Sequence, residues 1–243
     1  MSRNDANAKP YTERADGRSW TQTRPISARA GVIPQADGSA LFTIGKSTAY
    51  AAVYGPREIH PKFLANPNTG VLRCSYNMQP FSGPGARSRS GPSRRSKEIS
   101  LVTQRALEPV VDLSEFPNTV VDVFIEFIET DAGSRCAGIC AAAIALADAG
   151  ITMKDMVGAI AVGHVDGQTL VDLDGVEEHL GNEVADIPVA MIAATGEITL
   201  LQMDGITNTK TLLAALGEAH SCIKEIAKVQ RQALLDRYSE VKQ

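Results

Sequence analysis

The stretch TVVDVFIEFIETDAGSRCAGICAAAIALADAG, residues 119–150, contains the local pattern that decides the fold. Its beginning is rich in β-branched and aromatic side chains and predicts a strand over Thr119–Glu129. The Ala-rich run Cys136–Asp148 has no proline and is followed by Gly150, which predicts a helix with a glycine at its C-terminal end. The segment Asp131–Arg135 therefore lies where a strand passes into a helix.

Two interpretations of this junction stay open on local grounds. Unpaired backbone N–H groups and the helix dipole favour a bound anion near Gly133 and Ser134, and Arg135 is suited to bidentate contact with phosphate. In the alternative, Ser134 caps the helix and Arg135 is solvated. The junction alone therefore indicates an anion site without deciding for it.

Composition predicts a soluble globular protein of one large or two small domains. The chain has 243 residues, of which 44% are hydrophobic, enough for a substantial core. It contains no apolar run of the roughly 20 residues that a membrane span needs, and residues 1–9 are polar, unlike a signal peptide. We therefore predict a cytoplasmic protein without a membrane partner.

The scattered cysteines predict buried free thiols rather than a metal site or a disulfide.

The charge is strongly segregated although the net charge is only −4. Residues 57–105 contain nine basic side chains against Glu58 and Glu98, whereas residues 166–204 contain nine acidic side chains and no Lys or Arg. Either segment could be a solvated face. Together they indicate phosphate chemistry assisted by a divalent metal, with basic groups holding the substrate and carboxylates holding the ion.

Patterned segments on both sides of the opening stretch predict a mixed α+β fold. Strands are predicted at residues 27–33, 39–44, 47–54, 71–78, 157–164, 169–173, 184–193 and 198–203, the first three as an antiparallel meander. A helix is predicted from Ser93 to a stop at Pro117, and another over 209–238. This order predicts two related α+β halves around a common core, after a flexible tail at residues 1–11.

A basic loop and a basic helix start lie between the halves of this pattern. Residues 82–92 are rich in Gly, Pro and Arg, which predicts a loop that responds to substrate. Arg94 and Arg95 then fall in the first turn of the following helix. Cations are unfavourable there unless an anion is bound, so their position also favours a phosphate ligand.

Seven short motifs occur in order along residues 14–238. They are RADGR (14–18), ADGSA (36–40), YGPRE (54–58), PSRR (92–95), DAGSR (131–135), ADAGI (147–151) and LLQMDG (200–205). Each is weak by itself. In their order and spacing the chain resembles the RNase PH-like phosphorolytic exoribonucleases, and within that family the active-type core subunit of the archaeal exosome.

The resemblance implies an α+β fold related to domain 2 of ribosomal protein S5, duplicated within one compact domain over residues 12–240. It implies an enzyme that shortens single-stranded RNA from the 3′ end, with inorganic phosphate as co-substrate and nucleoside diphosphates as products. It also implies a six-membered ring in which such subunits alternate with a catalytically silent RNase PH-like partner. RNA would enter the ring through a central pore, past a cap of S1-domain subunits.

The resemblance also assigns residues to roles. Gly133, Ser134 and Arg135 would hold the attacking phosphate, and Arg94 and Arg95 would clamp the RNA backbone. Such contacts bind sugar and phosphate, so little sequence specificity is expected.

A loop that narrows the pore in the family resembles residues 57–63. Arg57, His60 and Lys62 are therefore weaker candidates for RNA contacts.

Two carboxylates would act at the leaving 3′ oxygen, by holding Mg²⁺ or Mn²⁺ or by supplying a proton. The family places two aspartates six positions apart. Here Glu178 falls at the first position, and a two-residue insertion brings Asp186 to the second. This departure leaves two alternatives beside the active ring enzyme: a catalytically silent RNA-binding ring subunit, and a self-assembled homohexamer.

Overall fold

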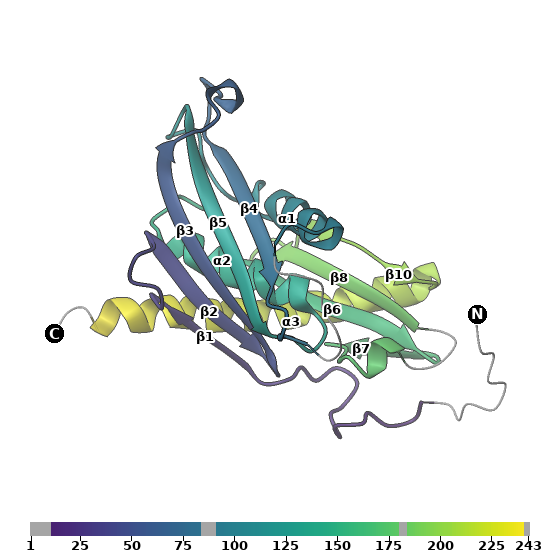
Figure 1. The fold of residues 1–243 in the computed structure, drawn as a ribbon. Coiled ribbons are helices and arrows are strands. Elements are labelled where there is room, and N and C mark those ends of the chain that lie inside the picture. Colours follow the sequence, from purple (N-terminus) through teal and green to yellow (C-terminus); the bar gives the residue numbers. More distant parts are fainter. Residues whose placement is uncertain (1–10, 84–90, 180–183, 241–243) are drawn as a thin grey trace.

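The computed structural model describes residues 11–83, 91–179 and 184–240, and these form two five-stranded sheets with three α-helices (Figure 1). The strands are β1 (Ile26–Ala30), β2 (Gly38–Ile44), β3 (Ser47–Glu58), β4 (Val71–Met78), β5 (Thr119–Glu129), β6 (Val157–Val165), β7 (Gln168–Val171), β8 (Val184–Ile192), β9 (Ile198–Leu201) and β10 (Asp204–Gly205). The helices are α1 (Arg94–Leu107), α2 (Ser134–Asp148) and α3 (Thr209–Glu240), with short 3-10 turns η1 (Lys62–Leu64) and η2 (Glu177–His179).

The first sheet has the order β1-β2-β3-β5-β4 and belongs to the N-terminal half. Strands β1, β2 and β3 form the predicted antiparallel meander. Strand β4 pairs with β5 in parallel, so the chain must cross over between them, and α1 makes that connection. The predicted S5-like pattern of strands followed by a helix is therefore present in this half.

The second sheet has the order β10-β8-β6-β7, with β9 also paired to β8, and its pairs are antiparallel. Helix α2 contacts β2 and β3 of the first sheet and β6 of the second, and α3 contacts β6 and β1. One hydrophobic core includes residues of both sheets and all three helices. The predicted arrangement of two halves about a common core is confirmed.

Helix α2 is buried along almost its whole length, including Ile139, Ile144 and Leu146. Its many alanines allow close approach of both sheets, and a helix that is apolar on all sides is stable only when it is covered on all sides. Helix α2 therefore lies between the two sheets, and its N-terminus lies where the two halves meet.

Several element ends differ from the predictions for identifiable reasons. Helix α1 ends at Leu107 rather than near Pro117, because Pro109 has no backbone N–H to continue the helical hydrogen bonds beyond Glu108. Strand β3 continues to Glu58 instead of ending at Tyr54, since a register shift lets it stay paired with β5. Strand β1 ends at Ala30, where Gly31 adopts a positive φ of 71°.

Other predictions concern the tail, the thiols and the loop at residues 82–92. Residues 1–10 and 84–90 lie outside the described residues, so the flexible tail, the domain boundary and the substrate-responsive loop stay predictions. Tyr11, at the edge of the predicted tail, donates its backbone N–H to Asp166 at 3.1 Å.

All four cysteines are free; Cys222 is half-buried, and the other three are buried as predicted. No helix in the described ranges is long and apolar enough to cross a membrane.

Candidate active site

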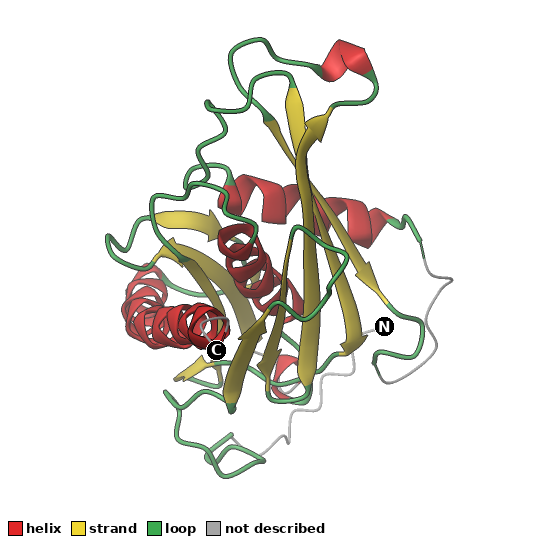
Figure 2. Cartoon of the chain, turned by 90° about the vertical axis from the view of Figure 1, so that its left-hand side faces the viewer, coloured by secondary structure: helices red, strands yellow, loops and turns green. Residues whose placement is uncertain are grey.

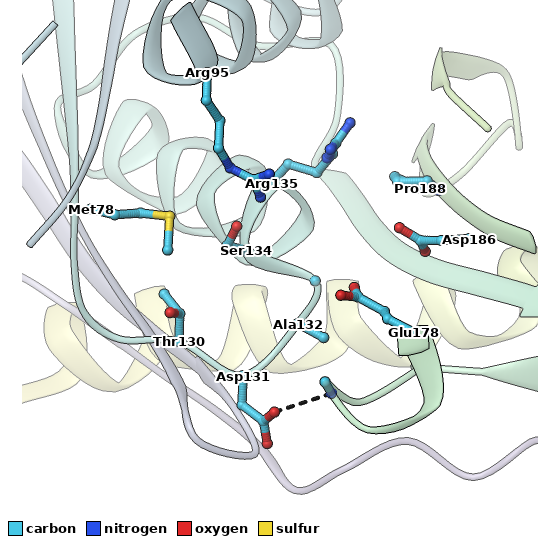
Figure 3. Close-up of a pocket in the computed structure, with 12 residues that line it drawn as sticks. Met78, Arg95, Thr130, Asp131, Ala132, Ser134, Arg135, Glu178, Asp186 and Pro188 are labelled. Carbon is cyan, nitrogen blue, oxygen red and sulfur yellow. Dashed lines mark hydrogen bonds between the residues drawn. The ribbon is translucent and has the colours of Figure 1, made fainter. Parts of the chain in front are cut away.

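A pocket of about 170 Å³ lies where the two halves meet at the N-terminus of α2. It is lined by Met78, Arg95, Thr130, Asp131, Ala132, Gly133, Ser134, Arg135, Gly175, Glu178, Asp186 and Pro188. Figure 3 shows Arg95 extending toward Ser134 and Arg135 pointing away from Ser134, while Glu178 and Asp186 lie across the pocket on the second half. The structure therefore brings together the predicted phosphate-binding residues, one predicted RNA-clamp arginine and both predicted catalytic carboxylates.

The predicted phosphate-binding part of this wall consists of the loop between β5 and α2. Helix α2 begins at Ser134, two residues earlier than predicted, and its N-cap Gly133 has φ 61° without a side-chain cap. Ala132 also has a positive φ of 55°. Left-handed residues followed by helical ones turn successive N–H groups toward one side, and the first amides of a helix have no partner within it. Ser134 is thus not the helix cap, and the amides of this loop favour an anion.

Ser134 and Arg135 are held by residues that the sequence did not single out as site residues. Tyr76 on β4 donates its hydroxyl hydrogen to Ser134 Oγ at 2.8 Å, and Ser134 is buried. Arg135 donates to the side-chain oxygen of Gln202, and Gln202 in turn donates to Glu98 at 3.1 Å. The alternation of apolar and polar residues along residues 71–78 was the sequence signal that could have indicated that Tyr76 faces the interior. No local pattern could indicate that Gln202, 67 residues away from Arg135, would fix its guanidinium.

The two arginines at the start of α1 occupy different positions. Ser93 caps the helix and accepts from the backbone N–H of Ser96 at 3.0 Å. Both side chains are exposed, but Arg95 lines the pocket, whereas Arg94 on the same turn is not part of the pocket wall. The structure thus separates two residues to which the resemblance assigned one role.

We predict that Arg95→Ala weakens binding of single-stranded RNA more than Arg94→Ala does. A charge-assisted hydrogen bond to a phosphate in the pocket contributes about 1.5–3 kcal/mol, which corresponds to roughly a tenfold to hundredfold loss, whereas a charge outside the pocket contributes about 1 kcal/mol or less. The two variants remove the same charge from neighbouring positions, so each controls for the other. The measurement is the KM for RNA at one fixed salt concentration; equal effects would contradict the prediction.

The two carboxylates come from different elements of the second half. Glu178 lies on η2, and Asp186 lies on β8 opposite Asp204 of β10. Burial raises the pKa of Asp186 to about 6, and the negative charges of Glu178 and Asp204 add to this rise. Arg135 and Arg95 oppose it, because they favour the ionised form. The predicted two-residue insertion lies between Glu178 and Asp186, and residues 180–183 of that segment lie outside the described residues.

Asp186 also has an orphaned atom. Its buried Oδ1 has no hydrogen-bond partner among the described residues. A buried carboxylate oxygen without a partner favours a bound cation or a proton. Within the described ranges no three or more His, Cys, Asp or Glu side chains are arranged as a complete metal site. The residues present still fit Mg²⁺, which binds through one or two carboxylates and completes its coordination with water and substrate phosphates.

Two other residues of the acidic segment serve a different purpose. Asp172 and Glu177 are buried, and they pair with Arg24 and Arg14 at 2.7 Å in each case. Only part of the acidic segment therefore faces the pocket. Its buried part is neutralised by arginines from the N-terminal segment, and Glu178, Asp186 and Asp204 line the hollow beside the pocket.

The segment with the three predicted pore-loop residues lies away from this pocket: the end of β3 pairs with the start of β5, whereas the pocket loop follows the end of β5. Figures 1 and 2 show the short turn η1 beyond that far end of the first sheet. Arg57 belongs to strand β3 rather than to a loop, and its guanidinium donates to Asp122 at 2.9 Å. His60 and Lys62 are exposed, and Lys62 pairs with Glu58 at 3.1 Å. The structure does not bring these residues to the candidate catalytic groups.

The fold and this site define the class of protein. The sequence matches two successive models of the 3′ exoribonuclease family, RNase PH domain 1 over residues 22–152 and domain 2 over residues 155–222. The chain belongs to this RNase PH family of 3′ exoribonucleases. The predicted fold and the predicted enzyme class, a phosphorolytic 3′→5′ exoribonuclease, are confirmed.

Individual relatives place the chain more narrowly. It is 49% identical over 231 residues to the exosome complex component Rrp41 of Thermococcus kodakarensis, a match that covers 95% of this chain and 92% of the relative. It is 46% identical over 225 residues to the Rrp41 component of Methanopyrus kandleri, with 93% of both chains covered.

Solved structures share the fold at lower identity. Rice (Oryza sativa) Rrp46 has a TM-score of 0.77 at 24% identity, covering 91% of this chain and 100% of that one. The Archaeoglobus fulgidus exosome with RNA bound to the active site has a TM-score of 0.76 at 23% identity, covering 89% and 92%. At these identities the likeness concerns the fold alone.

Proposed function

We propose that this chain shortens single-stranded RNA from its 3′ end as a catalytic subunit of an exosome-type ring. In each cycle an oxygen of inorganic phosphate attacks the terminal phosphorus, the bond from phosphorus to the 3′ oxygen breaks, and a nucleoside diphosphate leaves. The shortened RNA keeps the 3′ oxygen, which takes up a proton. The observation that supports this best is the single pocket that joins Gly133–Arg135 to Glu178 and Asp186.

In this proposal the first half positions the nucleophile. The amides at Gly133–Arg135, the Ser134 hydroxyl and the Arg135 guanidinium bind phosphate, and Arg95 neutralises the scissile phosphodiester. Arg94 contacts the RNA backbone outside the pocket. Arg57, His60 and Lys62 contact RNA farther from the reacting bond, since they lie near the tip of the first sheet.

The second half acts on the leaving oxygen. Glu178 and Asp186 would hold Mg²⁺ or Mn²⁺, and the ion, when bound, supplies positive charge for the developing 3′ oxyanion. Asp186, with a pKa of about 6, exchanges a proton readily near neutral pH, which suits it to a group that gains and loses charge during turnover.

The proposed assembly follows from the relatives, which are named exosome complex components. We infer that this chain alternates in a heterohexameric ring with a silent RNase PH-like subunit beneath S1-domain cap subunits, in the cytoplasm. The mass of the chain expressed alone tests this assembly. A stable homohexamer would contradict it, whereas a requirement for a partner subunit would support it.

The activity is tested with the assembled ring and a 5′-labelled single-stranded RNA. We expect shortening only when both phosphate and Mg²⁺ are present, with nucleoside diphosphates as products. A phosphate-free reaction and a fully duplex RNA serve as controls. Release of monophosphates without phosphate would contradict the mechanism, and RNA binding without phosphate-dependent release would identify a silent ring subunit instead.

A further inference from the structure

The segment before β1 places two arginines, Arg14 and Arg24, against the acidic loops that surround the pocket. Arg14 and Arg24 are 2% and 6% exposed, so both guanidinium groups lie inside the protein. Buried charges are costly unless they are paired and fully hydrogen-bonded. The reaction uses neither arginine, yet both connect to loops that carry pocket residues.

Arg14 holds the turn that carries Glu178. Its Nε and Nη2 donate to the two carboxylate oxygens of Glu177, each at 2.7 Å. Its remaining N–H groups donate to backbone carbonyls, including those of Val171 at 2.9 Å and Asp172 at 2.8 Å. Glu177 is fully buried and also accepts from Tyr11. Adjacent glutamates thus have opposite tasks: Glu177 anchors η2, and Glu178 reaches the pocket.

Arg24 holds the phosphate-binding loop. It donates to both carboxylate oxygens of Asp172, at 2.9 Å from Nε and 2.7 Å from Nη2, and its Nη1 donates to the backbone carbonyl of Asp131. The carboxylate of Asp131 accepts from the backbone N–H of Gly175 at 3.1 Å, the contact drawn in Figure 3. Gly175 precedes η2.

These contacts form a closed circuit. It runs from Asp131 through Arg24, Asp172, Arg14 and Glu177 to the turn of Gly175, and returns to Asp131. One side of the circuit carries the proposed phosphate site, and the other carries Glu178. We propose that Arg14 and Arg24 are positioning residues that together fix the separation between the phosphate-binding loop and the carboxylate of Glu178.

The proposal rests on the proposed function and divides the work between the two arginines. Arg14 controls Glu178, so its loss affects the chemical step and leaves phosphate binding intact. Arg24 binds the backbone carbonyl of Asp131, two residues before Gly133, so the loss of Arg24 weakens phosphate binding. A displacement of about 1 Å in a catalytic group costs up to about a hundredfold in rate, so effects of this order are expected.

The test uses Arg14→Lys and Arg24→Lys in the assembled ring. Lysine keeps the charge and cannot reproduce the paired bonds of guanidinium with a carboxylate. We expect Arg14→Lys to lower the single-turnover rate at saturating phosphate at least tenfold, with the KM for phosphate within about twofold of the wild type. We expect Arg24→Lys to raise the KM for phosphate at least tenfold.

A matched control is Arg237→Lys. Arg237 pairs with the buried carboxylate of Asp148 at the opposite end of α2, so this variant also loses an arginine bond to a buried carboxylate, away from the pocket. All three variants should melt at a lower temperature than the wild type, but Arg237→Lys should keep both the rate and the KM. If Arg237→Lys showed similar kinetic changes, the effects of Arg14→Lys and Arg24→Lys would reflect a general loss of stability, and the proposal would be overturned.

A second measurement does not depend on catalysis. Amide hydrogen exchange of a peptide over residues 171–179 should become at least tenfold faster in Arg14→Lys and stay unchanged in Arg237→Lys. Unchanged exchange in Arg14→Lys overturns the proposal, as does faster exchange without any loss of rate. If the wild-type ring releases no diphosphates, the proposed function fails, and the exchange experiment still decides whether Arg14 holds the turn.

Discussion

Replacing Asp186 with Asn is expected to abolish most of the phosphorolytic activity and, at the same time, to stabilise the protein above pH 6. The activity falls because the amide carries no charge for a metal ion and no exchangeable acid proton, and removal of such a group costs on the order of 10²–10⁴-fold in kcat. The stability rises because a partly buried carboxylate without a partner on Oδ1 is replaced by a neutral group of the same size.

The sign of the pH dependence follows from the two pKa values. An unfolded aspartate titrates near 3.8, whereas burial raises the pKa of Asp186 to about 6 in the folded protein. The folded state therefore holds the proton more tightly, and the stabilising contribution of this group, complete below pH 4, is lost as the pH rises through 6. A pKa difference of about 2 corresponds to at most about 3 kcal/mol, so a gain of about 2 kcal/mol is expected for the variant at pH 8.

The measurement is denaturant unfolding of both proteins at pH 4 and pH 8, at one protomer concentration, together with kcat at saturating phosphate. The control is Glu197→Gln, which removes one negative charge from an exposed position in the same acidic segment. It should change the free energy of unfolding by no more than a few tenths of a kcal/mol and kcat by no more than about twofold. Full activity of Asp186→Asn would exclude Asp186 from the reaction. If the difference in the free energy of unfolding between Asp186→Asn and the wild type did not grow from pH 4 to pH 8, a raised pKa of Asp186 would be excluded.

Replacing Arg135 with Ala has the second large expected effect, a loss of about 10²–10³-fold in kcat/KM for phosphate. This is the usual consequence of removing one donor from a site that binds a charged reacting group. Affinity for RNA should change little, because Arg95 remains in the pocket wall. Arg135→Lys should recover no more than about a tenth of the lost efficiency, since an ammonium group cannot form the bidentate bond.

The control for Arg135→Ala is Arg105→Ala, which removes the same charge from an exposed position on α1. The measured quantities are the initial rate of diphosphate release over a range of phosphate concentrations and the RNA affinity without phosphate. Equal losses in the two variants would show that net charge rather than the pocket is responsible. An unchanged KM for phosphate in Arg135→Ala would remove this residue from the phosphate site.

The elements of the fold were predictable where local pattern and tertiary environment agree. Strand β5 is recognisable as a β-branched run, and α2 as an Ala-rich run without proline, because both are buried and their composition reflects that burial. Element ends were less predictable. The extension of β3 to Glu58 depends on its pairing with β5, a partner that is distant in the sequence.

The candidate site shows the same division between local and distant information. The DAGSR motif at residues 131–135 indicated an anion site from local chemistry, and the resemblance to a known family supplied Arg95, Glu178 and Asp186. Neither indicated that Glu177 would be an internal anchor while Glu178 lines the pocket. Their chemistry is identical, and the difference arises from a guanidinium group 163 residues away.

The sequence by itself determined the class of fold, the anion-binding character of the junction before α2 and the family to which the chain belongs. These features depend on residues close together in the chain, or on the order of motifs along it. Only the tertiary structure decided which charges meet. It directed Asp172 and Glu177 to buried arginines and left Asp186 facing the pocket with an oxygen that has no partner in the described part of the chain. Pairing and desolvation depend on distances in space, which spacing along the chain does not determine.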